Sequence, residues 1–203
     1  MQWQRPAARA LLAGLLALPL SLSACKKPKP ERTGFEDAGP PRLSYPNTPE
    51  GARGVVNEFA KAGAHPVSIF KCLRPDPEDY DEVFTPEAAD KVRRSMDPVW
   101  YQGSLTLDPP TEQNGIVIGS ATTEELASGT GNAKACPGSL RKFAKHMKPG
   151  VTMYCFRFVK PGMPPGKLHD GLIFVRDHWA LFPKAPMFYQ WGLAEAGLLD
   201  DDE

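Results

Sequence analysis

Residues 151–182 read VTMYCFRFVKPGMPPGKLHDGLIFVRDHWALF, and they indicate most clearly which kind of fold the chain adopts. This stretch contains three runs rich in β-branched and aromatic residues, which are typical of strands: 151–159, 167–175 and 178–182. A segment rich in Pro and Gly separates the first two runs, and Arg176-Asp177 separates the last two. The stretch therefore predicts neighbouring strands in an antiparallel sheet, the last two forming a hairpin.

The half of the chain before this stretch is helical in pattern. Thr48-Pro49-Glu50 combines a capping residue, a Pro for the first turn and an acid for the positive end of the helix dipole. Thr85-Pro86-Glu87 repeats this chemistry, and apolar residues at intervals of three to four follow both starts. Helices first and strands later predict an α+β fold, with N-terminal helices packed on a curved antiparallel sheet. A short closing helix is expected at Gly192–Leu199.

This order of elements resembles the small exported domains of the cystatin-like, nuclear transport factor 2-like superfamily. The resemblance includes Asp170-Gly171-Leu172, His178-Trp179 and Phe182-Pro183-Lys184 in the closing strands, which also resemble those of bacterial lipoproteins. It implies a cone-like sheet that encloses an apolar pocket against the helices. In the enzymes of that superfamily, an Asp or His that points into the pocket acts as a general base.

The first 24 residues predict an export signal. Arg5 and Arg9 precede the apolar run Ala10–Leu22, which is shorter than the roughly 20 residues that a membrane-spanning helix needs. Leu22-Ser23-Ala24-Cys25 resembles the lipobox of bacterial lipoproteins, in which the Cys sulfur receives diacylglycerol. We therefore expect a signal peptide at 1–24 and a lipidated Cys25. The alternative is an ordinary secretory signal with an incidental Cys.

The rest of the chain divides by composition. Residues 25–47 are rich in Pro and Lys and predict a disordered tether, 48–199 predict a single α+β domain, and 200–203 form an acidic tail. Lys26 stands where an Asp signals inner-membrane retention in enteric bacteria. We therefore expect a cell-envelope protein whose lipid anchors it to the membrane, the outer membrane being favoured over the inner.

Composition excludes some classes of protein. The chain has 24 basic and 24 acidic side chains, so it lacks the positive excess of a dedicated nucleic-acid binder. The apolar fraction of 41% is enough for a packed core. None of the four histidines belongs to a short-spaced metal signature, and no nucleotide-binding loop is present, so no metal or cofactor is expected.

His169 and Asp170 are the candidates for catalysis. Either of them could serve as a general base in a pocket. Adjacent residues of a regular strand point to opposite faces, however, so both cannot line one pocket in such a strand. The favoured interpretation is a bend at Asp170-Gly171 with His169 at the surface.

Three cysteines remain once Cys25 is assigned to the lipid. Export permits a disulfide, and three thiols allow at most one within the chain. Cys136 and Cys155 are the favoured pair, which leaves Cys72 free. The alternative is three buried, reduced thiols.

Charges are segregated along the sequence. Residues 127–169 contain no Asp or Glu, and their bases include a cluster spaced to lie on one side of a short helix: Arg141, Lys142, Lys145 and Lys148. Residues 76–90 are strongly acidic. Two solvated faces that complement each other are one interpretation. An anion-binding patch for lipid headgroups, an anionic glycan or an acidic protein is the other.

Three functions follow from these features. The favoured one is a non-enzymatic envelope module that binds a small apolar ligand or an envelope partner. The second is a pocket enzyme of isomerase, dehydratase or hydrolase type that uses Asp170 or His169. The third is a structural or assembly subunit that docks through its aromatic end: Phe188, Tyr189 and Trp191.

Overall fold

The computed structural model describes most of the domain. The described residues are 41–61, 64–105, 107 and 115–197. They all lie in the compact unit Ala38–Glu203, whereas the unit Met1–Asp37 lies outside them. The expected signal peptide, Cys25 and the acidic tail 200–203 therefore fall outside the described residues. Among the described helices, none combines the length and the apolar character that crossing a bilayer requires.

Four helices precede the sheet: α1 (Pro49–Ala60), α2 (Pro66–Leu73), α3 (Pro77–Val83) and α4 (Pro86–Gln102). Each has a Pro in its first turn, where the missing N–H is not needed for the helix. At the start of α1, Thr48 Oγ1 accepts a hydrogen bond from the Gly51 N–H at 3.1 Å. The capping signals in the sequence therefore coincide with the observed starts of α1 and α4.

The sheet has four antiparallel strands in the order β1 (Gly115–Thr122), β2 (Thr152–Val159), β3 (His169–Val175) and β4 (His178–Leu181). Short helical pieces lie between β1 and β2: α5 (Thr123–Ser128), η1 (Gly131–Ala135), α6 (Ser139–Phe143) and η2 (Ala144–His146). Helix α7 (Ala185–Glu195) follows β4. The prediction of an α+β fold with helices packed on an antiparallel sheet is confirmed.

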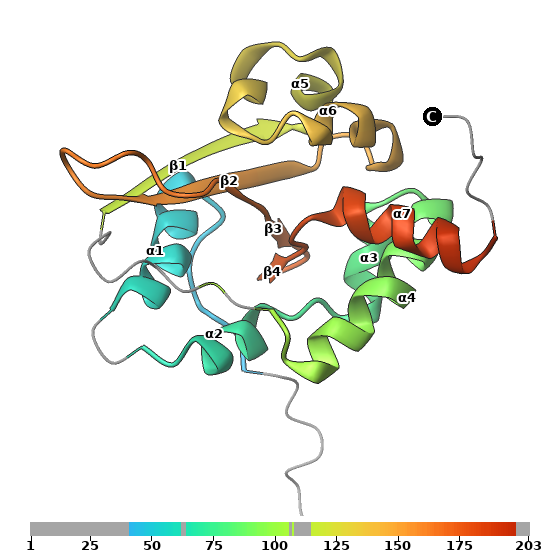
Figure 1. The fold of residues 1–203 in the computed structure, drawn as a ribbon, viewed down its shortest axis with the longest axis horizontal. Coiled ribbons are helices and arrows are strands. Elements are labelled where there is room, and N and C mark those ends of the chain that lie inside the picture. The colour runs from blue at the N-terminus through green and yellow to red at the C-terminus, as the bar shows by residue number, and fades with distance from the viewer. Residues whose placement is uncertain (1–40, 62–63, 106, 108–114, 198–203) are drawn as a thin grey trace, which may run out of the picture. The chain divides into compact units, whose positions relative to one another are not determined.

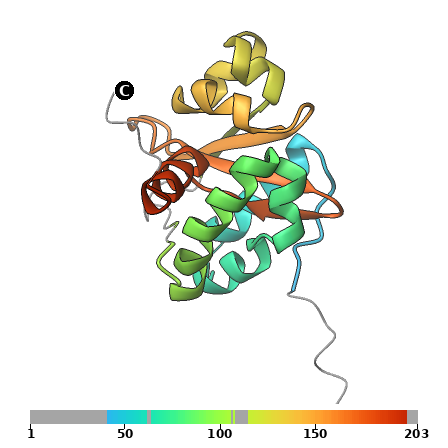
Figure 2. The same ribbon diagram turned by 90° about the vertical axis from the view of Figure 1, so that its right-hand side faces the viewer.

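The helices cover the sheet from two sides. Figure 1 shows α5 and α6 above β1 and β2, with α1 to α4 on the opposite side, and Figure 2 shows α7 beside α4. The core fills the space between sheet and helices. Phe182, which directly follows β4, is fully buried and makes edge contacts with Tyr80 at 5.2 Å and Phe84 at 5.4 Å between ring centroids. These contacts join the end of the hairpin to α3.

Residues 42–45, which the sequence assigns to the tether, lie against the domain. The Trp179 indole N–H donates to the Tyr45 carbonyl oxygen at 3.0 Å, and Arg42 donates to the Arg74 carbonyl oxygen at 2.8 Å. The boundary at residue 47 is therefore too late. Sequence reasoning missed this because the segment has no periodic pattern and its partners are distant along the chain.

The last helix also differs from the prediction. It begins at Ala185 rather than at Gly192. Lys184 takes the left-handed conformation with a φ of 53°, and Pro186 occupies the first turn. This start has no side-chain cap, so the usual signal for a helix start is missing from the sequence.

Candidate functional site

A cavity of about 580 Å³ lies between α7, the sheet and helices α2 and α4. Most of its wall is apolar and comes from separate elements: Phe70 of α2, Phe156 of β2, Leu181 of β4, and Phe188 and Trp191 of α7. Its volume lies in the range of about 300–1,000 Å³ that is usual for small-molecule sites. The cavity can therefore hold a ligand of the size of a small drug or a short acyl chain.

The polar side chains in the wall are few: Ser104, Ser139, Lys167, His169, Asp170 and Lys184. Four of these six come from two segments that touch each other. The Lys184 backbone N–H donates to Asp170 Oδ1 at 2.9 Å, which joins the start of α7 to the start of β3. The polar part of the wall is therefore concentrated where β3 and α7 begin.

An irregularity in β3 explains how His169 and Asp170 both come to line this cavity. Tyr154 of β2 pairs with Leu172, and Phe156 pairs with His169. Two residues of β3, Asp170 and Gly171, thus stand opposite one residue of β2, which is a β-bulge. Gly171 has a φ of 88°, and a Cβ there would collide with the Phe182 carbonyl oxygen. In a regular strand His169 and Asp170 would point to opposite faces. The bulge removes this restriction, and both residues line the cavity.

His169 is half-buried rather than at the surface, which corrects the favoured sequence interpretation. Its ring stacks on Phe156 with 5.3 Å between centroids and 19° between planes. Burial, together with the nearby charges of Lys167 and Lys184, lowers the pKa of His169 below its ordinary value of 6.5. The imidazole is therefore neutral at neutral pH.

Asp170 is 8% exposed, and burial raises the pKa of its carboxyl group. Hydrogen bonds from the backbone of Lys184 and of Asp170 itself oppose that shift. Because a left-handed backbone is unfavourable for a residue other than Gly, Lys184 needs a local partner. Asp170 supplies it and so anchors the start of α7.

A disulfide joins Cys136 to Cys155, the pair favoured from the sequence, with 5.3 Å between Cα atoms. It ties the connection between η1 and α6 to β2, next to Pro137 and Ser139 in the cavity wall. Cys72 is free and partly exposed on α2, and its thiol donates to the Ser68 carbonyl oxygen at 3.3 Å. The disulfide therefore supports one wall of the cavity.

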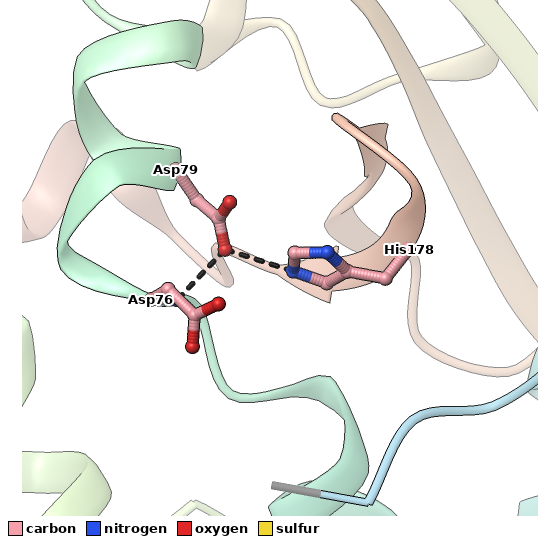
Figure 3. Close-up of side chains that lie close together, drawn as sticks. All are labelled: Asp76, Asp79 and His178. Carbon is pink, nitrogen blue, oxygen red and sulfur yellow. Dashed lines mark hydrogen bonds and ion pairs between the residues drawn. The ribbon is translucent and has the colours of Figure 1, made fainter. Parts of the chain in front are cut away.

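A second polar cluster lies away from the cavity, between α3 and the β3–β4 hairpin (Figure 3). Fully buried Asp79 accepts a hydrogen bond from the Asp76 N–H at 2.7 Å, and its Oδ2 is 2.9 Å from His178 Nε2. His178 Nδ1 lies 3.1 Å from exposed Asp177. Asp76, Asp79 and His178 each offer a potential metal-ligating atom, and these atoms lie within 4.8 Å of one another.

Two guanidinium groups neutralise the carboxylates of this cluster. Arg42 Nη2 is 2.6 Å from Asp76 Oδ1, and Arg176 Nη1 is 3.6 Å from Asp79 Oδ1. A divalent cation would have to bind beside both positive groups, so the arrangement favours an ion-pair network over a metal centre. The network fastens α3 to the hairpin.

Sequence reasoning missed this network. Asp79 and His178 are 99 positions apart, and no spacing motif connects them. The three-residue spacing of Asp76 and Asp79 is a signal for part of it, because the two form a capping box at the start of α3.

The expected anion-binding patch is distributed over more than one element. Arg141 and Lys142 lie on α6, Lys145 lies on η2 and Lys148 follows it. The first three side chains are exposed, and no salt bridge to any of the four occurs in the described part of the chain. Acids of the 76–90 stretch pair instead with other bases: Arg42, Lys91, Arg93, Arg94 and Arg176.

The aromatic end of the chain is mostly core. Phe188 and Tyr189 are buried, and the Tyr189 ring packs at a tilt against His146 with 4.3 Å between ring centroids. Trp191 is 49% exposed and makes an edge contact with Phe188. Phe188 and Tyr189 therefore belong to the core, and Trp191 is the exposed member of the aromatic end.

Comparisons of the chain with protein-family models, with curated proteins and with solved structures found no match. The resemblances to bacterial lipoproteins and to the cystatin-like, nuclear transport factor 2-like superfamily therefore stay predictions from sequence.

Proposed function

We propose that this protein is a lipid-anchored cell-envelope protein whose α+β domain binds a small, mainly apolar ligand and does not transform it chemically. The supporting observation is the cavity of about 580 Å³ with its largely apolar wall. Removing apolar surface from water contributes about 25 cal/mol per Å². Filling this cavity with an apolar ligand is therefore favourable without any catalytic group.

Filling the cavity by substitution tests this function. Met187 lines the cavity from α7, whereas Met163 is 45% exposed and lies outside it. Met187→Trp should weaken the binding of the neutral fluorescent probe N-phenylnaphthylamine, and Met163→Trp is the matched control. Equal binding by both variants, or no binding by the unmodified domain, would reject the cavity as a ligand site.

The anchor requires a separate experiment, because Cys25 lies outside the described residues. Cys25→Ser should abolish incorporation of labelled palmitate and release the protein from the membrane fraction. Cys72→Ser is the control, since it removes a thiol of the domain and leaves Cys25 intact. Membrane association that survives in Cys25→Ser would contradict the lipid anchor.

A pocket enzyme is the second candidate, and Asp170 supports it. Burial raises the pKa of this carboxyl in the wall of a cavity, which is a common property of acid–base groups. Its hydrogen bond to the Lys184 N–H gives it a structural role as well. Hydrolysis of para-nitrophenyl esters that is lost in Asp170→Asn, while probe binding persists, would establish the enzyme in place of the binding module.

A partner at the basic patch completes the proposal. Arg141, Lys142 and Lys145 are exposed and lack carboxylate partners in the described residues. Such a surface suits an anionic glycan, an acidic envelope protein or lipid headgroups rather than nucleic acid, for which the chain lacks a net positive charge.

A further inference from the structure

The charges around the cavity are unbalanced. Lys167 and Lys184 both line it, and neither has a carboxylate within salt-bridge distance in the described residues. Asp170 is the carboxylate in the wall, and its Oδ1 is already hydrogen-bonded to the Lys184 backbone N–H at 2.9 Å. One positive charge therefore remains at the polar part of the wall when Asp170 is ionised and His169 is neutral.

The start of α7 adds to this positive character. The helix has 11 residues, begins at Ala185 and runs along the cavity through Met187, Phe188 and Trp191. Its N-terminus carries a partial positive charge from the helix dipole, next to the side chain of Lys184. The cations and the apolar wall thus meet at the same end of α7.

We propose that the ligand of this cavity is an amphipathic anion, with an apolar body against Phe156, Leu181 and Phe188 and an anionic head at Lys167 and Lys184. This inference rests on the proposed binding function and specifies its ligand class. A carboxylate or phosphate head gains charge-assisted hydrogen bonds from the two ammonium groups. A cationic head would meet two like charges, and a neutral ligand would leave both lysines, which are exposed, to water.

Calorimetric titration of the domain with three ligands of equal chain length tests the charge preference. Decanoate, decanol and decyltrimethylammonium share an apolar tail and differ in the charge of the head. Decanoate should bind at least about threefold more tightly than decanol, because two exposed ammonium groups attract the carboxylate. The ammonium ligand should bind most weakly.

Substitution of the lysines tests the site of the head. The double variant Lys167→Gln with Lys184→Gln should lose the preference for decanoate and keep the affinity for decanol, which also shows that it is folded. The double variant Lys142→Gln with Lys145→Gln removes the same charge outside the cavity and should retain the preference. A preference for decanoate that survives in the first variant overturns the inference.

The outcomes separate this inference from the proposed function. Equal affinities for decanoate and decanol overturn the anionic ligand and leave the binding function intact. Failure of all three ligands and of the neutral probe overturns both. Binding to phosphatidylglycerol vesicles with no binding of soluble decanoate also overturns the inference, because the anion would then be recognised at a lipid surface and not in the cavity.

Discussion

Two regions of this domain bring an Asp, a His and basic side chains together, and they differ in how the charges are compensated. In the network between α3 and β4, Asp76 and Asp79 face Arg42, Arg176 and His178. At the cavity, Lys167 and Lys184 lie in an apolar wall beside Asp170, which is hydrogen-bonded to backbone. The first region is compensated from within the protein, and the second retains positive charge next to the cavity.

This difference separates a structural role, in the network, from a ligand-binding role, at the cavity. A buried carboxylate that is surrounded by cations of its own chain holds elements together and has little capacity left for a ligand. Cations without a carboxylate partner beside an apolar cavity have that capacity. The mere presence of Asp and His in one place is therefore a weak guide to function.

The largest effect is expected at the compensated network. Asp79→Ala leaves His178 and the Asp76 N–H without their partner, so it should lower the free energy of unfolding by about 3–5 kcal/mol. Glu78→Ala, at a neighbouring exposed position of α3, should change it by less than about 0.5 kcal/mol. Urea unfolding measures both, and similar losses for the two would contradict a structural network.

The disulfide allows a test on the cavity side of the comparison. Replacing Cys136 and Cys155 together by Ser should cost about 2–4 kcal/mol of stability, because the unfolded chain gains freedom. Since the bridge supports the cavity wall at Pro137, the double variant should also bind the neutral probe more weakly. Probe affinity that is unchanged in the folded double variant would show that the wall does not depend on the bridge.

Acidification should destabilise the domain through two histidines, His169 in the cavity wall and His146 against Tyr189 of α7. Burial and Lys145 lower the pKa of His146 below 6.5, and the pKa of His169 is lowered as well. Each histidine contributes stability that is fully present above its pKa in the unfolded chain. This contribution is lost as the pH falls through the lower pKa of the same histidine in the folded domain. His146→Phe should therefore flatten the acid limb of the stability profile, whereas His65→Phe, at an exposed position, should leave it unchanged.

The smallest effect on stability is expected at the basic patch. Lys142→Glu with Lys145→Glu changes exposed side chains, so the unfolding midpoint should hardly move. Retention on a heparin column at low salt should fall, because the local charge is reversed. Lys61→Glu with Lys71→Glu is the charge-matched control, because Lys61 directly follows α1 and Lys71 lies on α2, both exposed. Equal retention of both double variants would show that net charge, and not this patch, determines binding.

The helix starts and the order of helices and strands could be predicted from local signals, as at Thr48 and in the hairpin at Arg176-Asp177. The shared position of His169 and Asp170 could not, because it depends on a bulge that no residue before Gly171 announces. The Asp79–His178 contact depends on the folding of residues that are far apart. Local rules therefore predicted most of the elements but not the start of α7, and tertiary pairing determined the site.

The docking of residues 42–45 has a mechanical consequence. If Cys25 carries the lipid, it is 17 positions from Arg42, and a fully extended chain of that length reaches at most about 60 Å. Arg42 is bound to Asp76 and to the Arg74 carbonyl oxygen. Tension on the chain between Cys25 and Arg42 would therefore reach the domain at the ion-pair network. The pull of the membrane would then act first on the ion-pair network that joins α3 to the β3–β4 hairpin.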